Sequence, residues 1–160
     1  MPQPPIVQLE DVDKDYSLGE TTVHALVDCD LIFERGEFGT IAGPSGSGKT
    51  TVLNLVGCID VPTRGEVYID GQPTSGLGDK ELTNLRLQKL GFIFQSFNLI
   101  DVLDVYQNVE FPLLLQGELD ESQRRERVEH IVAEVGLDTH IEHRPNELSG
   151  GQRQRVAIAR

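Results

Sequence analysis

Residues 43–50 read Gly43-Pro44-Ser45-Gly46-Ser47-Gly48-Lys49-Thr50, and this stretch decides the fold. A short apolar run at 38–42 leads into it, and residues 49–58 behind it have the apolar spacing of a helix. Glycines let the backbone curl so that successive N–H groups converge on an anion, and the following helix presents its positive N-terminal end to the same anion. The order of strand, glycine loop and helix predicts an α/β fold with a phosphate site at the start of the helix.

The stretch also matches the P-loop pattern with the expected context on both sides. Lys49 would supply a mobile positive charge for the terminal phosphates of a nucleotide, and the Thr50 hydroxyl would ligate Mg²⁺. A plain glycine-serine turn is the alternative, and the strand before it and the helix after it argue against that. We therefore expect residues 43–51, with Thr51 included, to bind a nucleotide with magnesium.

Composition limits the other possibilities. The chain has 160 residues, 38% of them hydrophobic, which suits one compact domain. Its formal net charge of -12 opposes binding to a phosphate backbone, so we expect no nucleic-acid partner. Cys29 and Cys58 lack metal-ligand spacing and are expected to be buried free thiols of a reducing cytoplasm. The sequence has no secretory signal and no apolar run of about eighteen residues, so we expect contact with a membrane only through a partner.

The first half of the chain predicts strands and two helices. Segments 6–10, 23–26 and 28–34 alternate in hydrophobicity and predict a small antiparallel sheet. Residues 66–69 before the turn pair Asp70-Gly71 predict a hairpin. A helix is expected at 80–88 and a buried strand at 90–94.

The second half predicts helices. One is expected at 105–115, interrupted near Pro112, and a clearer one at 120–135. In the latter, apolar residues fall on one face, Asp120 with Gln123 resembles a capping box, and Gly136 suits the position after the helix. The apolar residues of that face are Val128, Ile131, Val132 and Val135.

A second glycine motif, Leu148-Ser149-Gly150-Gly151-Gln152, precedes an expected helix at 153–160. Two glycines after a serine expose backbone N–H groups at a helix start, which makes a second anion site. One chain that binds one triphosphate hardly needs two such sites, so this one is expected to address a nucleotide held by another subunit. In isolation the motif would be better explained as a surface turn.

With its flanks, the stretch 146–160 resembles the signature of the ABC ATPase family, and the resemblance covers nearly the whole chain. Segments 57–60, 65–71 and 92–100 resemble the subgroup that serves lipoprotein release and macrolide-type export. The resemblance implies the ATP-binding subunit of an ABC transporter. The implied fold is an α/β P-loop NTPase core with an antiparallel β subdomain and an α-helical subdomain that carries the signature.

The resemblance also implies roles for single residues. Gln95 matches the glutamine that reaches Mg²⁺ and the attacking water, Tyr16 matches the aromatic residue that stacks on adenine, and 97–102 matches the surface that receives the membrane subunit. From the residues alone, Gln95 is a polar residue that ends an apolar strand, Tyr16 could be an ordinary packed tyrosine, and 97–102 could be buried core. The implied residues that contact the other subunit's nucleotide are Ser149, Gly150, Gly151 and Gln152.

Some positions depart from the family pattern. Gly39 and Ala42 stand where larger apolar residues are usual. The family's apolar strand ending in Asp-Glu, its dimer-contact loop and its histidine loop do not follow the signature helix. We therefore expect the sequence to be an N-terminal part of the domain, without the C-terminal core strands and the catalytic carboxylate. We expect ATP hydrolysis only from the full-length protein. Its expected parts are the β subdomain and P-loop core at 1–95, the helical subdomain at 96–150 and the start of the signature helix at 151–160.

The resemblance implies a homodimer, with ATP and Mg²⁺, that binds transmembrane permease subunits through residues 95–102 on the inner face of the cell membrane. A non-transport ABC ATPase of DNA repair or chromosome maintenance is one alternative, but the sequence shows neither the heptads nor the cysteine cluster common in that group. A non-catalytic nucleotide-binding module is the other alternative.

Overall fold

The computed structural model describes residues 3–160, which form two compact units, one up to residue 86 and the other at 87–160. Each unit has its own buried core. The division that we expected at residue 95 falls inside the second unit.

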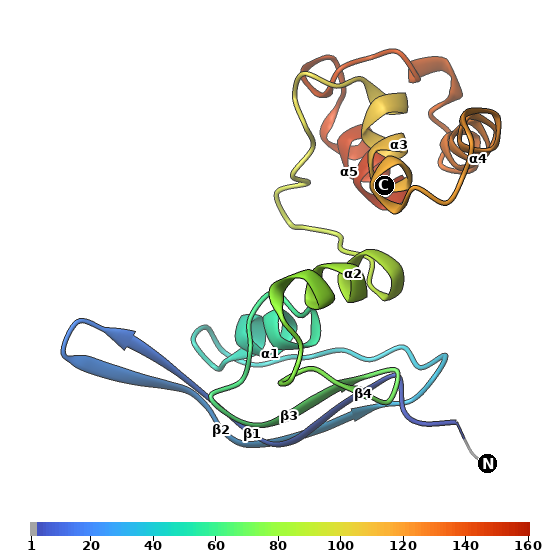
Figure 1. The fold of residues 1–160 in the computed structure, drawn as a ribbon. Coiled ribbons are helices and arrows are strands. Elements are labelled where there is room, and N and C mark those ends of the chain that lie inside the picture. The colour runs from blue at the N-terminus through green and yellow to red at the C-terminus, as the bar shows by residue number, and fades with distance from the viewer. Residues whose placement is uncertain (1–2) are drawn as a thin grey trace. The chain divides into compact units, whose positions relative to one another are not determined.

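The first unit is built on one antiparallel sheet (Figure 1). Its strands are β1 (Val7–Leu18), β2 (Thr21–Phe33), β3 (Arg64–Ile69) and β4 (Gln72–Pro73), in the order β2-β1-β3-β4. Alternate residues of β1 and β3 are buried, which is the period of a sheet with one covered face. The expected antiparallel sheet and the hairpin around Asp70-Gly71 are confirmed, although segments 23–26 and 28–34 form one continuous strand.

Two helices accompany this sheet. Helix α1 (Lys49–Val56) contacts β2 and β3 and buries Val52 and Leu55, and α2 (Asp79–Lys89) buries Leu82 and Leu85. The Arg86 guanidinium of α2 donates a hydrogen bond of 2.5 Å to the carbonyl oxygen of Cys58, just beyond the end of α1. Both expected helices are confirmed, and Arg86 ties one to the other.

The strands expected at 38–42 and 90–94 do not form. Among residues 3–160 every strand belongs to the one sheet, and neither segment pairs with it. An isolated extended segment has no partner for its backbone N–H and C=O groups, so apolar sequence alone does not make it a strand. The Phe38 side chain in the first of these segments is 94% exposed. A Cβ at Gly39 would lie 2.1 Å from the Phe33 ring, which explains the small residue at that position.

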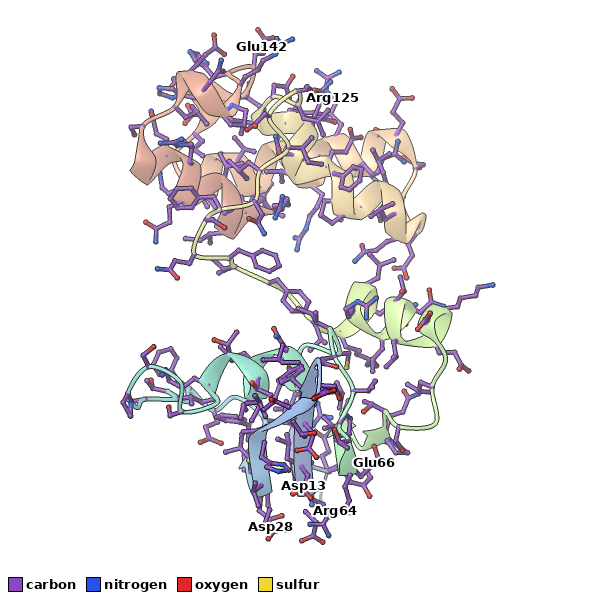
Figure 2. The ribbon with its side chains drawn as sticks, turned by 90° about the vertical axis from the view of Figure 1, so that its left-hand side faces the viewer. Asp13, Asp28, Arg64, Glu66, Arg125 and Glu142 are labelled. Atoms are coloured by element: carbon purple, nitrogen blue, oxygen red, sulfur yellow. The ribbon has the colours of Figure 1, made fainter. Side chains whose placement is uncertain are left out.

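An ion cluster holds the irregular part of β1 (Figure 2). Arg64 donates to Asp13 at 2.6 Å and to Asp28 at 2.7 Å, and the Asp28 N–H donates to Asp13. The hydrogen bond from Arg64 and then that from the Asp28 N–H hold the pKa of the Asp13 carboxyl below its usual value. The neighbouring Gly65 has φ +80°, and a Cβ there would lie 2.3 Å from the Asp11 carbonyl oxygen, so no other residue fits this approach.

The second unit is helical. Its elements are α3 (Val105–Gln116), α4 (Glu121–Glu134), η1 (Asp138–His140), η2 (Pro145–Glu147) and α5 (Gly150–Ala159). Its core consists of Val105, Val109, Val128, Val132, Leu137, Leu148 and Val156. Helix α3 runs through Pro112 without a break, contrary to the expected interruption. Proline removes one intrahelical bond, but a capping box at Asp104 and the left-handed Gly117 hold the two ends.

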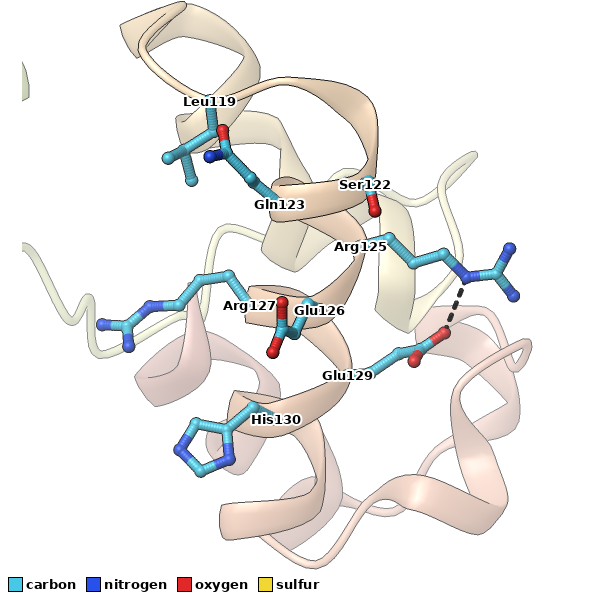
Figure 3. Close-up of a pocket in the computed structure, with 8 residues that line it drawn as sticks. All are labelled: Leu119, Ser122, Gln123, Arg125, Glu126, Arg127, Glu129 and His130. Atoms are coloured by element: carbon cyan, nitrogen blue, oxygen red, sulfur yellow. Dashed lines mark hydrogen bonds and ion pairs between the residues drawn. The ribbon is translucent and has the colours of Figure 1, made fainter.

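Helix α4 matches the prediction most closely. Val128 and Val132 are fully buried, the Asp120–Gln123 capping box is present, and Gly136 has φ +66° just past the end. The opposite face is polar, with an ion pair of 2.9 Å between Arg125 and Glu129 (Figure 3). The helix is therefore held by its apolar stripe and its caps.

Asn108, fully buried in α3, holds the segment that follows residue 99. Its Oδ1 accepts from the Ile100 N–H at 2.9 Å, and its Nδ2 lies within 3.2 Å of the carbonyl oxygens of Ile100, Leu103 and Asp104. A single side chain thus binds several backbone groups of this segment and supplements the backbone hydrogen bonds to Ile100 and Asp104.

We predict that Asn108→Ala lowers the free energy of unfolding by about 2 to 4 kcal/mol, because a fully buried amide and its hydrogen bonds to the Ile100 N–H and the Leu103 carbonyl oxygen are lost together. Urea denaturation followed by circular dichroism measures the change. The exposed Asn146→Ala is the control and should change stability by less than about 0.5 kcal/mol. Equal effects of the two substitutions would contradict this role of Asn108.

Candidate functional site

The glycine loop of residues 43–48 is shaped by left-handed backbone. Gly46 has φ +82° and Gly48 has φ +83°, and Gly48 is the residue from which α1 begins. A Cβ at Gly48 would lie 2.8 Å from the Ala25 carbonyl oxygen, so the loop lies directly against β2. The loop therefore curls as the sequence predicts, and it ends at a helix N-terminus, where backbone N–H groups have no intrahelical partner.

Lys49 lies over this loop. Its ammonium is 3.0 Å from the carbonyl oxygen of Gly43, 2.6 Å from that of Pro44 and 3.4 Å from Ser47 Oγ. An ammonium carries three donors that rotate freely, so the same group can turn to phosphate oxygens. Thr50 is exposed in the first turn of α1, and its hydroxyl oxygen is the kind of ligand that Mg²⁺ takes. These residues fit a bound triphosphate with magnesium.

Tyr16 on β1 is half-buried and tied to the same region. Its hydroxyl donates to Asp60 Oδ2 at 2.8 Å, and the Thr51 side chain acts on the same phenol by lowering its pKa. Burial, together with the hydrogen bond to Asp60, raises the pKa of the Tyr16 phenol above its usual value. Sequence reasoning named Tyr16 and Thr51 but missed Asp60, whose partners lie more than forty residues away.

The second glycine motif forms the start of α5. Ser149 is the N-cap residue: its Oγ accepts from the Gln152 N–H at 3.3 Å, and Gln152 Oε1 accepts from the Ser149 N–H at 2.7 Å. The helix therefore begins at Gly150 and not at 153, because this capping box outweighs the low helix propensity of two glycines. Gly150 and Gly151 are exposed in its first turn, with nothing within 4 Å of where a Cβ would stand.

Gln95 is exposed in a turn of the same unit, and the segment after it contacts the signature helix. The Arg153 guanidinium lies over the Phe97 ring at 5.9 Å from its centroid, and Arg160 donates to the Asn98 carbonyl oxygen at 2.7 Å. Val102 is 75% exposed, so residues 97–102 are not a continuous buried run. The structure thus brings this segment and the signature helix together through two arginines that sequence reasoning did not name.

Two negative findings concern the described residues 3–160. Within them, no group of three or more His, Cys, Asp or Glu side chains is placed to hold a metal ion. No helix among them is both long and apolar enough to cross a membrane.

The glycine loop at the start of α1, with Lys49 over it, defines a nucleotide-binding protein of the P-loop class. The family described as ABC transporter matches residues 26–160. The chain belongs to the ABC transporter family, among its ATP-binding proteins. The resemblance inferred from the signature is therefore confirmed.

Relatives support this assignment over nearly the whole chain. The ABC transporter ATP-binding protein MJ0796 of Methanocaldococcus jannaschii is 48% identical over 97% of this chain and 67% of its own length. The macrolide export ATP-binding/permease protein MacB of Hyphomonas neptunium is 46% identical over 98% of this chain and 24% of its own length. The chain thus spans about two thirds of MJ0796 and about a quarter of MacB.

Solved structures agree. A dimeric structure of MJ0796 in a post-hydrolysis state, bound to ADP and Pi, has a TM-score of 0.87 and 49% identity over 96% of this chain and 67% of that chain. The structure of cbiO1 from Clostridium perfringens, part of the ABC transporter complex cbiONQ, has a TM-score of 0.83 at 31% identity over 98% of this chain and 61% of that chain. The expected fold class is confirmed. The nucleotide roles of the individual site residues stay predictions.

We predict that Gly48→Ala destabilises the first unit more than Gly46→Ala does. Both substitutions force an L-residue into left-handed backbone, which lowers the free energy of unfolding by about 1 to 2 kcal/mol. Only the Cβ at residue 48 meets other atoms, and that clash adds about 1 to 3 kcal/mol. Chemical denaturation without nucleotide measures both, and equal losses of stability would contradict the close approach to β2.

Proposed function

We propose that the chain binds Mg-ATP and that the full-length dimer hydrolyses it to drive transmembrane subunits. The observation that carries this proposal is the loop in which Gly46 and Gly48 are left-handed and Lys49 lies over the curled backbone at the start of α1. That arrangement offers convergent N–H groups, a helix N-terminus and a mobile cation to one polyphosphate.

The roles divide by chemistry. The backbone N–H groups of 43–51 and the Lys49 ammonium hold the phosphates, and the hydroxyl of Thr50 with the amide oxygen of Gln95 would hold Mg²⁺. Bound magnesium would neutralise charge on the phosphates. Tyr16 offers a ring on which adenine can stack without hydrogen bonds to its edges.

The signature serves the nucleotide of a second subunit in this proposal. Gly150 and Gly151 are exposed in the first turn of α5, where backbone N–H groups suit an anion. A dimer is supported by the relative MJ0796, whose structure with ADP and Pi is dimeric. Two copies would then enclose two ATP molecules, each between one loop at 43–51 and the partner's residues 149–152.

Permease subunits are the other proposed partners, and they would place the protein on the inner face of the cell membrane. MacB is named as both ATP-binding protein and permease, which supports a link between this domain and membrane subunits. The exposed Val102, on a segment held to α5 by Arg153 and Arg160, offers a surface for such a contact.

Hydrolysis by residues 1–160 alone is not part of the proposal. The site residues supply N–H, ammonium, hydroxyl and amide groups, and none of them is a carboxylate, the group that most suits activation of water here. A non-catalytic nucleotide-binding module has the same binding site, so binding and turnover must be measured separately.

We predict that Lys49→Ala abolishes measurable Mg-ATP binding while leaving the fold intact, because Lys49 contacts only loop atoms and its bonds to phosphate are charge-assisted. Titration calorimetry measures binding, and circular dichroism checks the fold. Phosphate release by 1–160 at saturating Mg-ATP should equal that of the variant. Unchanged ATP affinity in Lys49→Ala would refute the P-loop site, and release above the variant would show a working carboxylate within the chain.

We also predict that Gly151→Phe spares binding of the first nucleotide and suppresses ATP-dependent dimerisation and turnover. Gly151 is exposed and a Cβ there meets no atom within 4 Å, so we expect the defect to arise at the partner. The full-length protein, which carries a substitution that blocks hydrolysis, is analysed by size-exclusion chromatography in the presence of ATP. Ser149→Phe should behave alike in the dimer assay, and the exposed Glu126→Phe on α4 is the control. An undiminished dimer peak would count against the role in trans.

A further inference from the structure

Three side chains of the first unit form one closed group: Lys14, Tyr16 and Asp60. The Asp60 carboxylate accepts a hydrogen bond from the Lys14 ammonium at Oδ1 (2.6 Å) and one from the Tyr16 hydroxyl at Oδ2 (2.8 Å). The Val61 N–H also donates to Oδ1 at 2.8 Å, and the ammonium donates again to the Val61 carbonyl oxygen at 2.8 Å. Each oxygen of this carboxylate therefore has a defined partner.

The group is too well desolvated to be an ordinary surface ion pair. The Lys14 side chain is 10% exposed and that of Asp60 is 26% exposed. Burial by itself would raise the pKa of the Asp60 carboxyl, but the hydrogen bonds from Lys14 and Tyr16 outweigh it and hold the pKa below its usual value. A buried ion pair contributes little net stability, because desolvation of both charges offsets their attraction. What such a pair does provide is a fixed geometry for the groups bound to it.

The fixed object is the Tyr16 ring. The Lys14 ammonium lies over the ring at 4.9 Å from its centroid, within the range of a cation–π contact. The phenol oxygen is held by Asp60, which lies beyond the C-terminal end of α1, and the Thr51 side chain in the first turn of that helix interacts with the same phenol. The ring is therefore positioned relative to α1, the helix at whose start the phosphate loop lies.

We propose that Asp60, together with Lys14, is a positioning residue that holds Tyr16 as the stacking platform for the adenine ring of the bound nucleotide. This inference rests on the proposed binding of ATP at the glycine loop. The ammonium covers one face of the ring, so the base stacks on the other. Since the carboxylate neutralises the ammonium, Lys14 does not act as a phosphate ligand, and the group recognises the base and not the polyphosphate.

The test compares two ligands, Mg-ATP and magnesium with inorganic tripolyphosphate, by titration calorimetry on the 160-residue chain. Tyr16→Ala should weaken ATP roughly tenfold, as loss of a base-stacking ring does, and leave tripolyphosphate unchanged. Asp60→Asn should weaken ATP roughly three- to tenfold, also without effect on tripolyphosphate. The matched control is Asp15→Asn, the neighbour of Tyr16 on β1, whose carboxylate pairs with His24 at 2.7 Å; it should change neither affinity.

A second variant covers the case in which Asp60→Asn does not fold. Tyr16→Phe keeps the ring and removes only the hydroxyl, so it should weaken ATP about threefold and spare tripolyphosphate. Wild-type ATP affinity in Tyr16→Phe would contradict the role of the hydrogen bond between Tyr16 and Asp60.

The outcomes separate the inference from the proposed function. If Asp60→Asn keeps the wild-type affinity for ATP, or loses affinity for ATP and tripolyphosphate equally, the positioning role is overturned. The proposed binding of ATP is not affected by that result. Wild-type ATP affinity in Tyr16→Ala would overturn the platform. Wild-type affinity of Lys49→Ala for both ligands would instead overturn the binding site at residues 43–51.

Discussion

The left-handed backbone at Gly48 is the constraint on which the first unit and its candidate site depend. It ends the loop, starts α1 and lets the loop approach the backbone of β2 within a distance that no Cβ allows. Lys49, Thr50 and Thr51 follow at once, so their side chains are placed by the first turn of a helix and not by a mobile loop. The proposed phosphate site and the Thr51 side chain near Tyr16 are therefore both placed by the start of α1.

The sequence predicts what local patterns decide. The glycine loop, the apolar stripe of α4 and the Asp120–Gln123 capping box each depend on residues within a few positions of one another, and the structure contains all three. The prediction that α5 starts at residue 153 is three residues late, because it did not include the capping box at Ser149. The fold class and family followed from the two glycine motifs and their flanks.

What the sequence could not predict depends on distant partners. Whether 38–42 or 90–94 becomes a strand depends on a neighbouring strand, which an apolar run does not specify. Asp60 is joined to Lys14 and Tyr16 across more than forty residues, and Arg160 is joined to Asn98 across about sixty. Such pairs can be identified only when the positions of the elements are known. For this reason the sequence predicted the residues within the motifs of the candidate site but not the residues that support them.

Arg86 and Cys58 have a consequence for how the first unit can be followed in solution. Burial raises the pKa of the Cys58 thiol, with Arg86 opposing that effect more weakly, so the thiol is a poor nucleophile while α1 and α2 remain packed. The Arg86 hydrogen bond to the Cys58 backbone joins that packing to the residues just before Asp60. Any opening of the two helices exposes the sulfur and restores its reactivity, and the rate at which a thiol reagent modifies Cys58 then reports the local unfolding of the helix that begins at the phosphate loop.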